Sequence, residues 1–254
     1  MSFIVVIPSR YQSSRLPGKP LADIGGKPMV KWVYEQAQKS AAEQVVIATD
    51  DTRIKGVAED FGAHVVMTSP DHPSGTDRLA EVADKLALTE DEVVVNVQGD
   101  EPLIPPAVID QVAGNLLANL DCAAATLSHA IHTTSEFKDP SAVKVVSNAS
   151  EQALYFSRAP IPWPRDLELK DESLPEDFVP QRHIGIYAYR AALLKAFVNW
   201  EKAPLEQLES LEQLRILQQG KKIHVQQAIA DVPSGIDTNK DLQRVRELLL
   251  ECKK

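Results

Sequence analysis

The sequence predicts a mixed α/β fold in which helices cover a mostly parallel β-sheet that also carries an antiparallel insertion. Up to about residue 120, short runs of β-branched residues alternate with segments of helical periodicity, which indicates right-handed β-α-β crossovers. Beyond that point extended runs follow one another, as is typical of antiparallel strands. The 254 residues are 44% hydrophobic and 25% charged, so we expect one composite domain over 1–254, with the insertion at about 120–200.

The first half of the chain contains four apolar runs that predict buried parallel strands. These runs are 3–7, 45–49, 65–67 and 93–97. Pro28 suits the first position of a helix to about Ser40, and Asp51 can cap a second helix that Gly62 ends. Helical spacing of apolar residues predicts a third helix over about 76–86 and a fourth that begins at Pro105 or Pro106.

The second half begins with extended runs that predict antiparallel strands at 142–146, 153–157 and 183–189. A proline-rich, acidic stretch at 160–180 interrupts them, and we expect it to form a mobile or partner-facing loop. Helical periodicity returns over 205–219, where Gly220 can end the helix. A strand at about 223–228 and a helix from about Thr238 complete the predicted fold.

Composition excludes several classes of function. The chain has 27 Lys and Arg against 36 Asp and Glu, and its net charge of -9 repels nucleic acids and anionic membranes. No run approaches the roughly 20 apolar residues of a membrane span, so we expect a cytoplasmic protein. Cys122 and Cys252 match no metal or redox spacing, which predicts two free thiols.

A basic loop follows the first predicted strand and carries Arg10, Arg15 and Lys19. Ligands of open α/β sheets bind at the carboxyl ends of strands, which favours a binding role over a solvated surface loop. The loop lacks both the dinucleotide-binding glycine pattern and the P-loop pattern. Guanidinium and ammonium groups can instead hold phosphates directly, as in a nucleotidyltransferase that binds a nucleoside triphosphate.

Two carboxylates are candidates for a magnesium site. Asp100 follows the fourth predicted strand and would face the basic loop, where Mg²⁺ can be held by one or two carboxylates and by substrate phosphates. The alternative is that Asp100 caps the next helix. Asp237 lies between a late strand and a helix, a position at which an aspartate is more often a helix cap than a metal ligand.

Two further segments could contact a ligand. The polar loop from Thr68 to Arg78 could bring backbone groups to a base or a phosphate, although a surface turn explains it equally well. In an alternating strand His183, Gly185 and Tyr187 share a face, which suits a polyhydroxylated ligand, with a core histidine as the alternative. The acidic residues of 205–215 are most simply explained as the solvated side of an amphipathic helix.

Together these segments closely resemble the 3-deoxy-manno-octulosonate (Kdo) cytidylyltransferases, and the resemblance covers essentially the whole chain. The matching motifs, in order, are IPSRYQSSRLPGKPL, IATDD, HPSGTDRLAEV, VNVQGDEPLI, AVKVV, ALYFSRAPIPW, HIGIYAYR, LEQLESLEQLR, GKKIHV and IDTNKDLQRV. The RLPGKP segment alone would indicate only a nucleotidyltransferase. The ordered set is specific to the family.

The resemblance implies a Rossmann-like, three-layer nucleotidyltransferase fold that dimerises through the antiparallel insertion. It also implies that the protein transfers the cytidylyl group of CTP to Kdo, an acidic eight-carbon sugar, and releases pyrophosphate. The product, CMP-Kdo, would serve lipopolysaccharide biosynthesis.

The resemblance also implies roles for individual residues. Arg10, Arg15 and Lys19 would hold the CTP phosphates, and Arg10, Lys19 and Asp100 would be catalytic. The cytidine end would be recognised by Ser74, Gly75 and Arg78, and Mg²⁺ would be bound by Asp100 and Asp237. The sugar pocket would be lined by Gln98, Arg158, His183, Tyr187 and Gln213.

The sequence departs from the family pattern at a few places outside these groups. Ser9 stands where alanine is usual, Asp77 replaces the commoner glutamate, and 167–180 follows no alignable pattern. Relatives that act on 8-amino-Kdo share most of the motifs, so that sugar is a second candidate acceptor. A sialic-acid cytidylyltransferase or a sugar-1-phosphate nucleotidylyltransferase would also keep the RLPGKP-like loop. A non-catalytic nucleotide sensor would bind CTP without releasing pyrophosphate.

Overall fold

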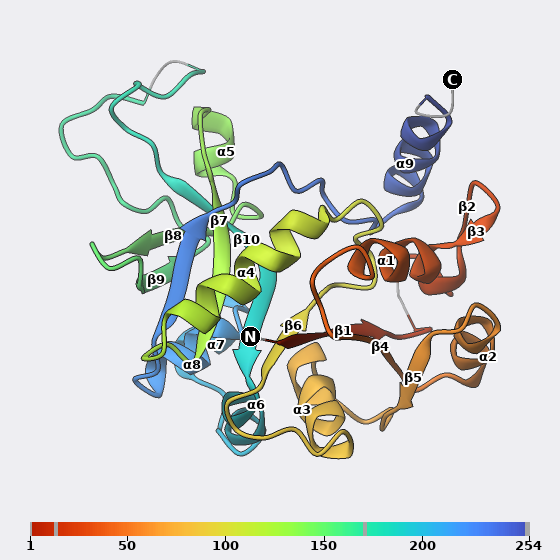
Figure 1. The fold of residues 1–254 in the computed structure, drawn as a ribbon. Helices are drawn as coiled ribbons and strands as arrows, with labels where there is room; N and C mark the ends of the chain where they lie inside the picture. Colours follow the sequence, from red (N-terminus) through yellow and green to blue (C-terminus); the bar gives the residue numbers. More distant parts are fainter. Residues whose placement is uncertain (1, 13–14, 170–171, 252–254) are drawn as a thin grey trace.

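The computed structural model describes residues 2–12, 15–169 and 172–251, so Cys252 lies outside the described residues, whereas Cys122 is a buried free thiol. A large sheet forms the centre of the molecule (Figure 1). Its strands follow the order β11-β7-β10-β6-β1-β4-β5, and β8 joins β10 to β9 at one side. The strands of this sheet are β1 (Phe3–Ser9), β4 (Gln44–Thr49), β5 (His64–Met67), β6 (Val93–Asn96), β7 (Ala124–Ala130), β8 (Lys144–Ser147), β9 (Ala153–Ser157), β10 (Gln181–Arg190) and β11 (Ile223–Gln227). A small second sheet pairs β2 (Asp23–Ile24) with β3 (Lys27–Pro28).

The strand directions confirm a mostly parallel sheet. Along the path from β11 to β5, β10 alone among the described strands runs against the others. The antiparallel part does not form a sheet of its own, because β10 lies between β6 and β7 and hydrogen-bonds to both. The parallel strands and the antiparallel region therefore belong to one continuous sheet, which β10 joins.

Helices cover both faces of this sheet, as Figure 1 shows. The helical elements are η1 (Lys19–Leu21), α1 (Met29–Ala37), α2 (Thr52–Asp60), α3 (Gly75–Lys85), α4 (Pro106–Ala118), α5 (Thr134–Lys138), α6 (Ala191–Phe197), α7 (Pro204–Glu209), α8 (Gln213–Gln218) and α9 (Asn239–Glu251). One buried cluster packs α1, α2 and α4 against the sheet, and a second packs α3, α6 and α8 against the opposite face. The fold is thus three-layered, as the resemblance implied.

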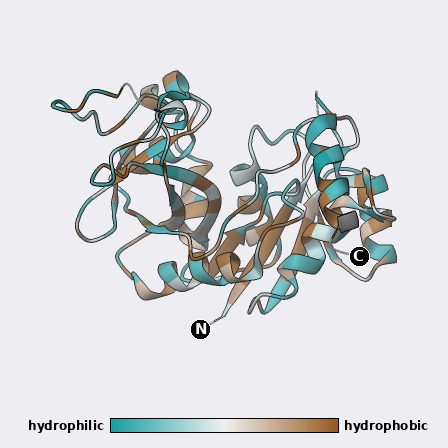
Figure 2. Cartoon of the chain, turned by 90° about the horizontal axis from the view of Figure 1, so that it is seen from above, coloured by the Kyte–Doolittle hydropathy of each residue, from teal (hydrophilic) through white to brown (hydrophobic). Residues whose placement is uncertain are grey.

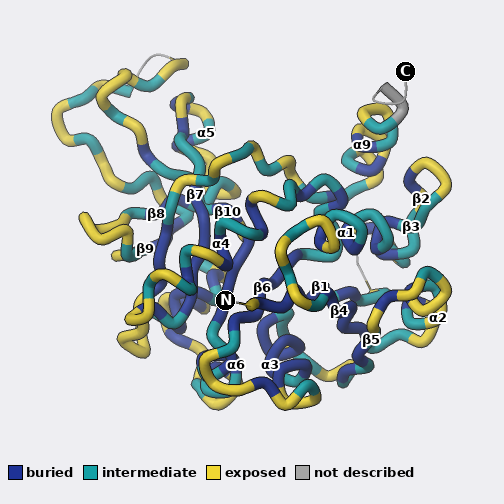
Figure 3. Tube along the Cα trace, in the orientation of Figure 1, coloured by how far each residue is buried: buried dark blue, intermediate teal, exposed yellow. Residues whose placement is uncertain are grey.

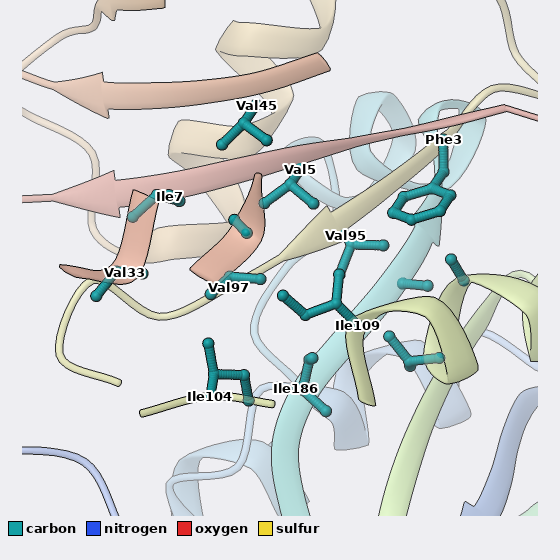
Figure 4. Packing of buried hydrophobic residues seen from close by; sticks show 14 of the residues in the cluster. Phe3, Val5, Ile7, Val33, Val45, Val95, Val97, Ile104, Ile109 and Ile186 are labelled. Atoms are coloured by element: carbon teal, nitrogen blue, oxygen red, sulfur yellow. The ribbon is translucent and has the colours of Figure 1, made fainter. Parts of the chain in front are cut away.

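Alternate side chains of β1 pack into the two buried clusters on opposite faces of the sheet. Val5 and Ile7 belong to the cluster under α1 and α4, which also contains Val33, Val95 and Ile109 (Figure 4). The residues between them along the strand, such as Val6, belong to the cluster on the other face. An entirely apolar strand is therefore required at the centre of the sheet, since both of its faces are covered.

Two predicted helix boundaries were wrong. Pro28 is the residue before α1 rather than its first residue, because its ψ of 146° is extended and it pairs within the small sheet. The single helix expected over 205–219 is two helices, since Ser210 adopts a left-handed conformation with φ of 53° that ends α7. Sequence reasoning also missed β7, α5 and α6.

Hydrophobic residues concentrate in the strands and hydrophilic residues on the outer helices (Figure 2). The connection from β9 to β10 extends away from the sheet, and many of its described residues are exposed (Figure 3). Among the described residues, no helix is both long enough and apolar enough to cross a bilayer.

Candidate active site

Three chain segments meet at the carboxyl ends of β1 and β6. A Cβ atom on Gly99 would lie 2.7 Å from the backbone oxygen of Pro8, so only glycine permits this approach of the two strand ends. The third segment is fixed by a hydrogen bond of 2.8 Å from the Ile236 amide to the Asp100 carbonyl. A Cβ atom on Gly235 would lie 3.2 Å from the same carbonyl oxygen. These contacts bring residues far apart in the sequence to one edge of the sheet.

A cleft of about 390 Å³ opens between these segments, and we call it the basic cleft. It is lined by Pro8, Ser9, Arg10, Gln12, Arg15, Lys19, Pro20, Gly75, Gln98, Gly99, Asp100 and Asp237. The structure therefore brings together the predicted phosphate-binding residues and both predicted metal ligands.

The carboxylates of Asp100 and Asp237 both contact the ammonium group of Lys19 in this cleft. The Lys19 Nζ lies 2.6 Å from Asp100 Oδ2 and 3.2 Å from Asp237 Oδ1. Arg15 also pairs with Asp237, at 3.1 Å. Two carboxylates that line one cleft fit the donor set that Mg²⁺ uses, and substrate phosphates and water would supply the remaining ligands.

The alternative that these aspartates are helix caps finds no support. Helix α4 begins at Pro106, and its N-cap is Pro105 rather than Asp100. At the start of α9 the Thr238 hydroxyl accepts from the Asp241 amide, and Asp241 accepts in return from the Thr238 amide. No group of three or more His, Cys, Asp or Glu side chains forms a metal site within the described ranges. A site here would need ligands from the substrate.

Arg10 is held in place by backbone oxygens of the loop before α3. Its Nη2 donates to the His72 carbonyl at 2.6 Å and to the Ser74 carbonyl at 3.0 Å. The loop is anchored in turn to Glu81 of α3, which pairs with His72 and accepts from the Ser69 amide. Burial alone would raise the pKa of Glu81, but hydrogen bonds from Lys85, His72 and the Ser69 amide lower it to about 2.

The predicted cytidine-recognition residues have different positions. Gly75 lines the basic cleft, whereas the Ser74 hydroxyl caps α3 and donates to Asp77 at 2.6 Å. Arg78 is fully buried and pairs with Asp50 at 3.2 Å and with the Thr68 hydroxyl. Desolvation lowers the pKa of Arg78. Its guanidinium links α3 to the residues that follow β4 and β5, and it lies outside the lining of the cleft.

A second cavity of about 270 Å³ adjoins the basic cleft, and we call it the aromatic pocket. It is lined by Gly75, Thr76, Asn96, Gln98, His183, Gly185, Tyr187, Tyr189, Phe197, Ser210, Leu211, Glu212, Gln213 and Ile216. Because Gly75 and Gln98 line both cavities, the two are contiguous. Asn96 Oδ1, Tyr187 OH and Gln213 Nε2 are buried here without hydrogen-bond partners. Unpaired polar atoms of this kind suit a ligand with several hydroxyl groups.

The regular alternation predicted for β10 is interrupted between His183 and Tyr187. Pairing with β7 shifts register between Ile184 and Tyr187, so the strand bulges at Gly185. His183, Gly185 and Tyr187 nevertheless line the same pocket. Desolvation lowers the pKa of His183 to about 3, which keeps its ring neutral.

Arg158 does not line either cavity. Its Nε donates to the Glu209 carbonyl at 2.7 Å and its Nη1 to the Pro140 carbonyl at 3.0 Å. Its partner Glu209 is followed in the sequence by Ser210, which lines the aromatic pocket.

Sequence reasoning missed several lining residues. Glu212 was interpreted as solvated, but its carboxylate accepts from the Thr76 hydroxyl at 2.8 Å inside the pocket. Glu206, interpreted in the same way, is buried in an ion pair with Arg215. Tyr189 continues the alternation of His183 and Tyr187, a signal that could have identified it. Asn96 carried no comparable signal.

Comparison with known proteins places these features in one family. The model of the Cytidylyltransferase family matches residues 4–223. A 3-deoxy-manno-octulosonate cytidylyltransferase of Cellvibrio japonicus is 61% identical over 251 residues, which are 98% of each protein. The enzyme of the same name from Saccharophagus degradans is 57% identical over 252 residues, 98% of this chain and 99% of the relative.

Solved structures agree. A CMP:2-keto-3-deoxy-manno-octonic acid synthetase complexed with CTP superposes with a TM-score of 0.89 at 42% identity, over 99% of both chains. A nucleotidyl transferase from Methanothermobacter thermautotroptrophicus shares the fold, with a TM-score of 0.62 at 13% identity over 99% of both chains.

Proposed function

Because the chain belongs to the 3-deoxy-manno-octulosonate cytidylyltransferase family, we propose that it transfers the cytidylyl group of CTP to Kdo in the two adjoining cavities. The observation that carries this proposal is the contiguity of a cation-lined cleft with a pocket of unpaired polar groups. The first matches a triphosphate and the second a polyhydroxylated sugar. Gln98 and Gly75, which line both, lie where the two substrates must meet.

In the basic cleft, Arg10, Arg15 and Lys19 bind the phosphates of CTP. Each supplies N–H donors to anionic oxygens, and the guanidinium of Arg10 is already oriented by two backbone carbonyls. Gly75 leaves room for the nucleoside, while Ser74 and Arg78 support the loop that surrounds it. The phosphates displace the carboxylates as partners of Lys19 and Arg15.

Asp100 and Asp237 would hold a Mg²⁺ ion, and Lys19 would then pair with the phosphates. When bound, the ion would supply positive charge that stabilises the developing negative charge on the phosphates. The fit rests on the donor set, because two carboxylates that share one ammonium group can share one divalent cation instead.

In the aromatic pocket, Gln98, His183, Tyr187 and Gln213 bind the hydroxyl groups of Kdo. The buried, unpaired Nε2 of Gln213 and OH of Tyr187 gain partners from the sugar. Arg158 offers the planar fork that a carboxylate prefers. To reach the sugar carboxylate it must release the Glu209 and Pro140 carbonyls that it contacts in this structure.

The reaction is an in-line displacement at the α-phosphorus of CTP. The C2 hydroxyl oxygen of Kdo forms the new O–P bond while the bond to the β-phosphate oxygen breaks, pyrophosphate leaves and the hydroxyl proton passes to solvent. Lys19, Arg10 and Arg15 neutralise the charge that builds on pyrophosphate. His183 is a poor base because its pKa is lowered to about 3, so positioning and charge stabilisation carry the catalysis.

The enzyme acts as a homodimer through the antiparallel part of the sheet, in the cytoplasm where CTP is made, and supplies CMP-Kdo for lipopolysaccharide synthesis. Exposed apolar side chains in this part, Leu154, Trp163 and Val179, support a partner-covered surface. Light scattering of the purified protein should give twice the chain mass of 27.9 kDa.

Pyrophosphate release tests the function directly. The purified protein is incubated with CTP and Mg²⁺ and with Kdo, 8-amino-Kdo or sialic acid, with EDTA as a control for metal dependence. We expect release with Kdo and its loss with EDTA. Release only with 8-amino-Kdo would change the acceptor, and release with none of the three would contradict the proposal.

A further inference from the structure

Thr126 lies in the middle of β7, fully buried, at the point where β10 bulges. Its hydroxyl oxygen is 2.7 Å from the Ile186 carbonyl oxygen and 3.0 Å from the Ile184 carbonyl oxygen. It is also 3.1 Å from Nε2 of His183. Three partners thus lie within hydrogen-bond distance of one hydroxyl group, and the Tyr187 hydroxyl is a further neighbour.

The single proton of the Thr126 hydroxyl decides which of these contacts it donates to and which it accepts from. A hydroxyl has one proton, and both carbonyl oxygens can only accept, so the proton of Thr126 belongs to the carbonyls, chiefly to the nearer Ile186 oxygen. The contact with Nε2 is then attractive only if Nε2 carries a hydrogen and donates it to Thr126. In a neutral imidazole, a protonated Nε2 leaves Nδ1 as an acceptor.

We propose that Thr126 is a positioning residue of the sugar site, because it fixes His183 as the Nε2–H tautomer and so presents Nδ1 as an acceptor for a hydroxyl group of the sugar. This inference rests on the proposed function, since it assigns a specific contact within the pocket. Gln213 Nε2 can only donate to the sugar, and His183 adds an acceptor for a hydroxyl donor to that offered by Asn96 Oδ1.

The surroundings of His183 keep it in this state. Its ring lies edge-on to Phe156, with centroids 5.0 Å apart, and 5.3 Å from the Tyr187 ring. Desolvation lowers the pKa of His183 to about 3, so the ring remains neutral at neutral pH. Protonation of Nδ1, which would convert the acceptor into a donor, is therefore disfavoured.

The same hydroxyl also holds the bulge. The Ile184 and Ile186 carbonyls flank Gly185, and both lie within hydrogen-bond distance of the Thr126 hydroxyl where the register with β7 shifts. The spacing of His183 and Tyr187 along the pocket thus depends on one buried hydroxyl group. Thr126→Val preserves the shape of the side chain and removes that group, while Thr126→Ser keeps it.

The tautomer can be measured without any substrate. In protein labelled with ¹⁵N-histidine, two-bond ¹H–¹⁵N correlations distinguish protonated from unprotonated ring nitrogens, and the His183 signals are those missing from His183→Gln. We expect a protonated Nε2 and an unprotonated Nδ1 at neutral pH in the wild type and in Thr126→Ser. A protonated Nδ1 in the wild type would overturn the proposal, whether or not the variants fold.

Kinetics provide the second readout. Thr126→Val should raise KM for Kdo about tenfold with KM for CTP unchanged, and Thr126→Ser should restore it, as for the loss of one buried hydrogen bond. Thr126→Val with wild-type tautomer and wild-type KM would contradict a positioning role. If the wild type itself fails to use Kdo, the proposed function fails, while the tautomer of the ligand-free protein still decides the structural part of this inference.

Discussion

Lys19 and Asp100 form an ion pair of 2.6 Å across the basic cleft, and the same ammonium group lies 3.2 Å from Asp237. The lysine thus occupies the space between the two carboxylates that we propose as metal ligands. If these carboxylates bind a metal ion as proposed, the ion and Lys19 would compete for this position in the absence of nucleotide. When triphosphate is present, Lys19 gains anionic partners of its own and the competition ends.

Lys19→Gln should therefore separate metal binding from catalysis. Without the competing cation, the affinity of the nucleotide-free protein for Mg²⁺ should rise about tenfold, whereas kcat should fall by about 10² or more because a contact to the leaving pyrophosphate is lost. Isothermal titration with Mg²⁺ and a pyrophosphate assay measure the two effects. Lys39→Gln, at an exposed position, is the control. If Lys19→Gln lowered both the affinity for Mg²⁺ and kcat, that result would argue against competition at this site.

Asp100→Asn should lower kcat by about 10² to 10⁴ with little effect on folding. The Asp100 side chain is 29% exposed, and an amide can retain its size but not its charge. Turnover at saturating CTP and Mg²⁺, together with thermal unfolding, checks both statements. Glu43→Gln, on the exposed residue before β4, should leave both unchanged. Wild-type turnover in a folded Asp100→Asn protein would remove Asp100 from the metal site.

Gly99→Ala should destabilise the protein by about 1 to 3 kcal/mol, because the added methyl group meets the Pro8 backbone oxygen at 2.7 Å. Activity should fall as well, since the strand ends that carry Arg10 and Asp100 must separate. Gly114→Ala within α4 is the matched control: its Cβ meets nothing within 4 Å, and alanine is the better helix former by about 0.5 to 1 kcal/mol. Denaturant unfolding of both variants gives the comparison, and equal stabilities would contradict the close approach.

Local sequence patterns were sufficient to predict the parallel half of the fold. The apolar runs of β1, β4 and β6 are buried on both faces, and that of the edge strand β5 is partly buried, so their composition carries the signal directly. β7 was missed because its sequence, Ala-Ala-Thr-Leu-Ser-His-Ala, has little β-propensity and becomes a strand through pairing with β10 and β11.

The basic cleft was predictable because its residues follow strand ends, where the sheet itself gathers them. The aromatic pocket was less so. Glu212 lies in it because α7 ends at Ser210, whose left-handed φ of 53° sequence periodicity does not reveal. The role of Thr126 depends on a bulge in a strand that is distant in the sequence. Such contacts are set by tertiary packing.

The contact between His72 and Glu81 connects Arg10 to α3, and it should be sensitive to pH. The pKa of the Glu81 carboxyl falls from its usual 4.5 to about 2 in the folded protein, so the unfolded chain binds the proton more tightly. The resulting stabilisation is complete above pH 4.5 and is lost as the pH falls from there toward 2. Solvent screening of this partly exposed group limits it to about 1 to 2 kcal/mol.

Glu81→Gln should accordingly be less stable than the wild type by this amount at pH 7, and the difference should shrink as the pH falls below 4.5. Denaturant titrations from pH 3 to 7 measure it. Glu59→Gln removes a more exposed carboxylate, paired with Lys55 at 3.7 Å, and should show almost no such trend. Because the loop that binds Arg10 loosens with Glu81, KM for CTP should rise in Glu81→Gln at pH 7. A difference in stability that stays constant down to pH 3 would show that packing, not charge, accounts for the role of Glu81.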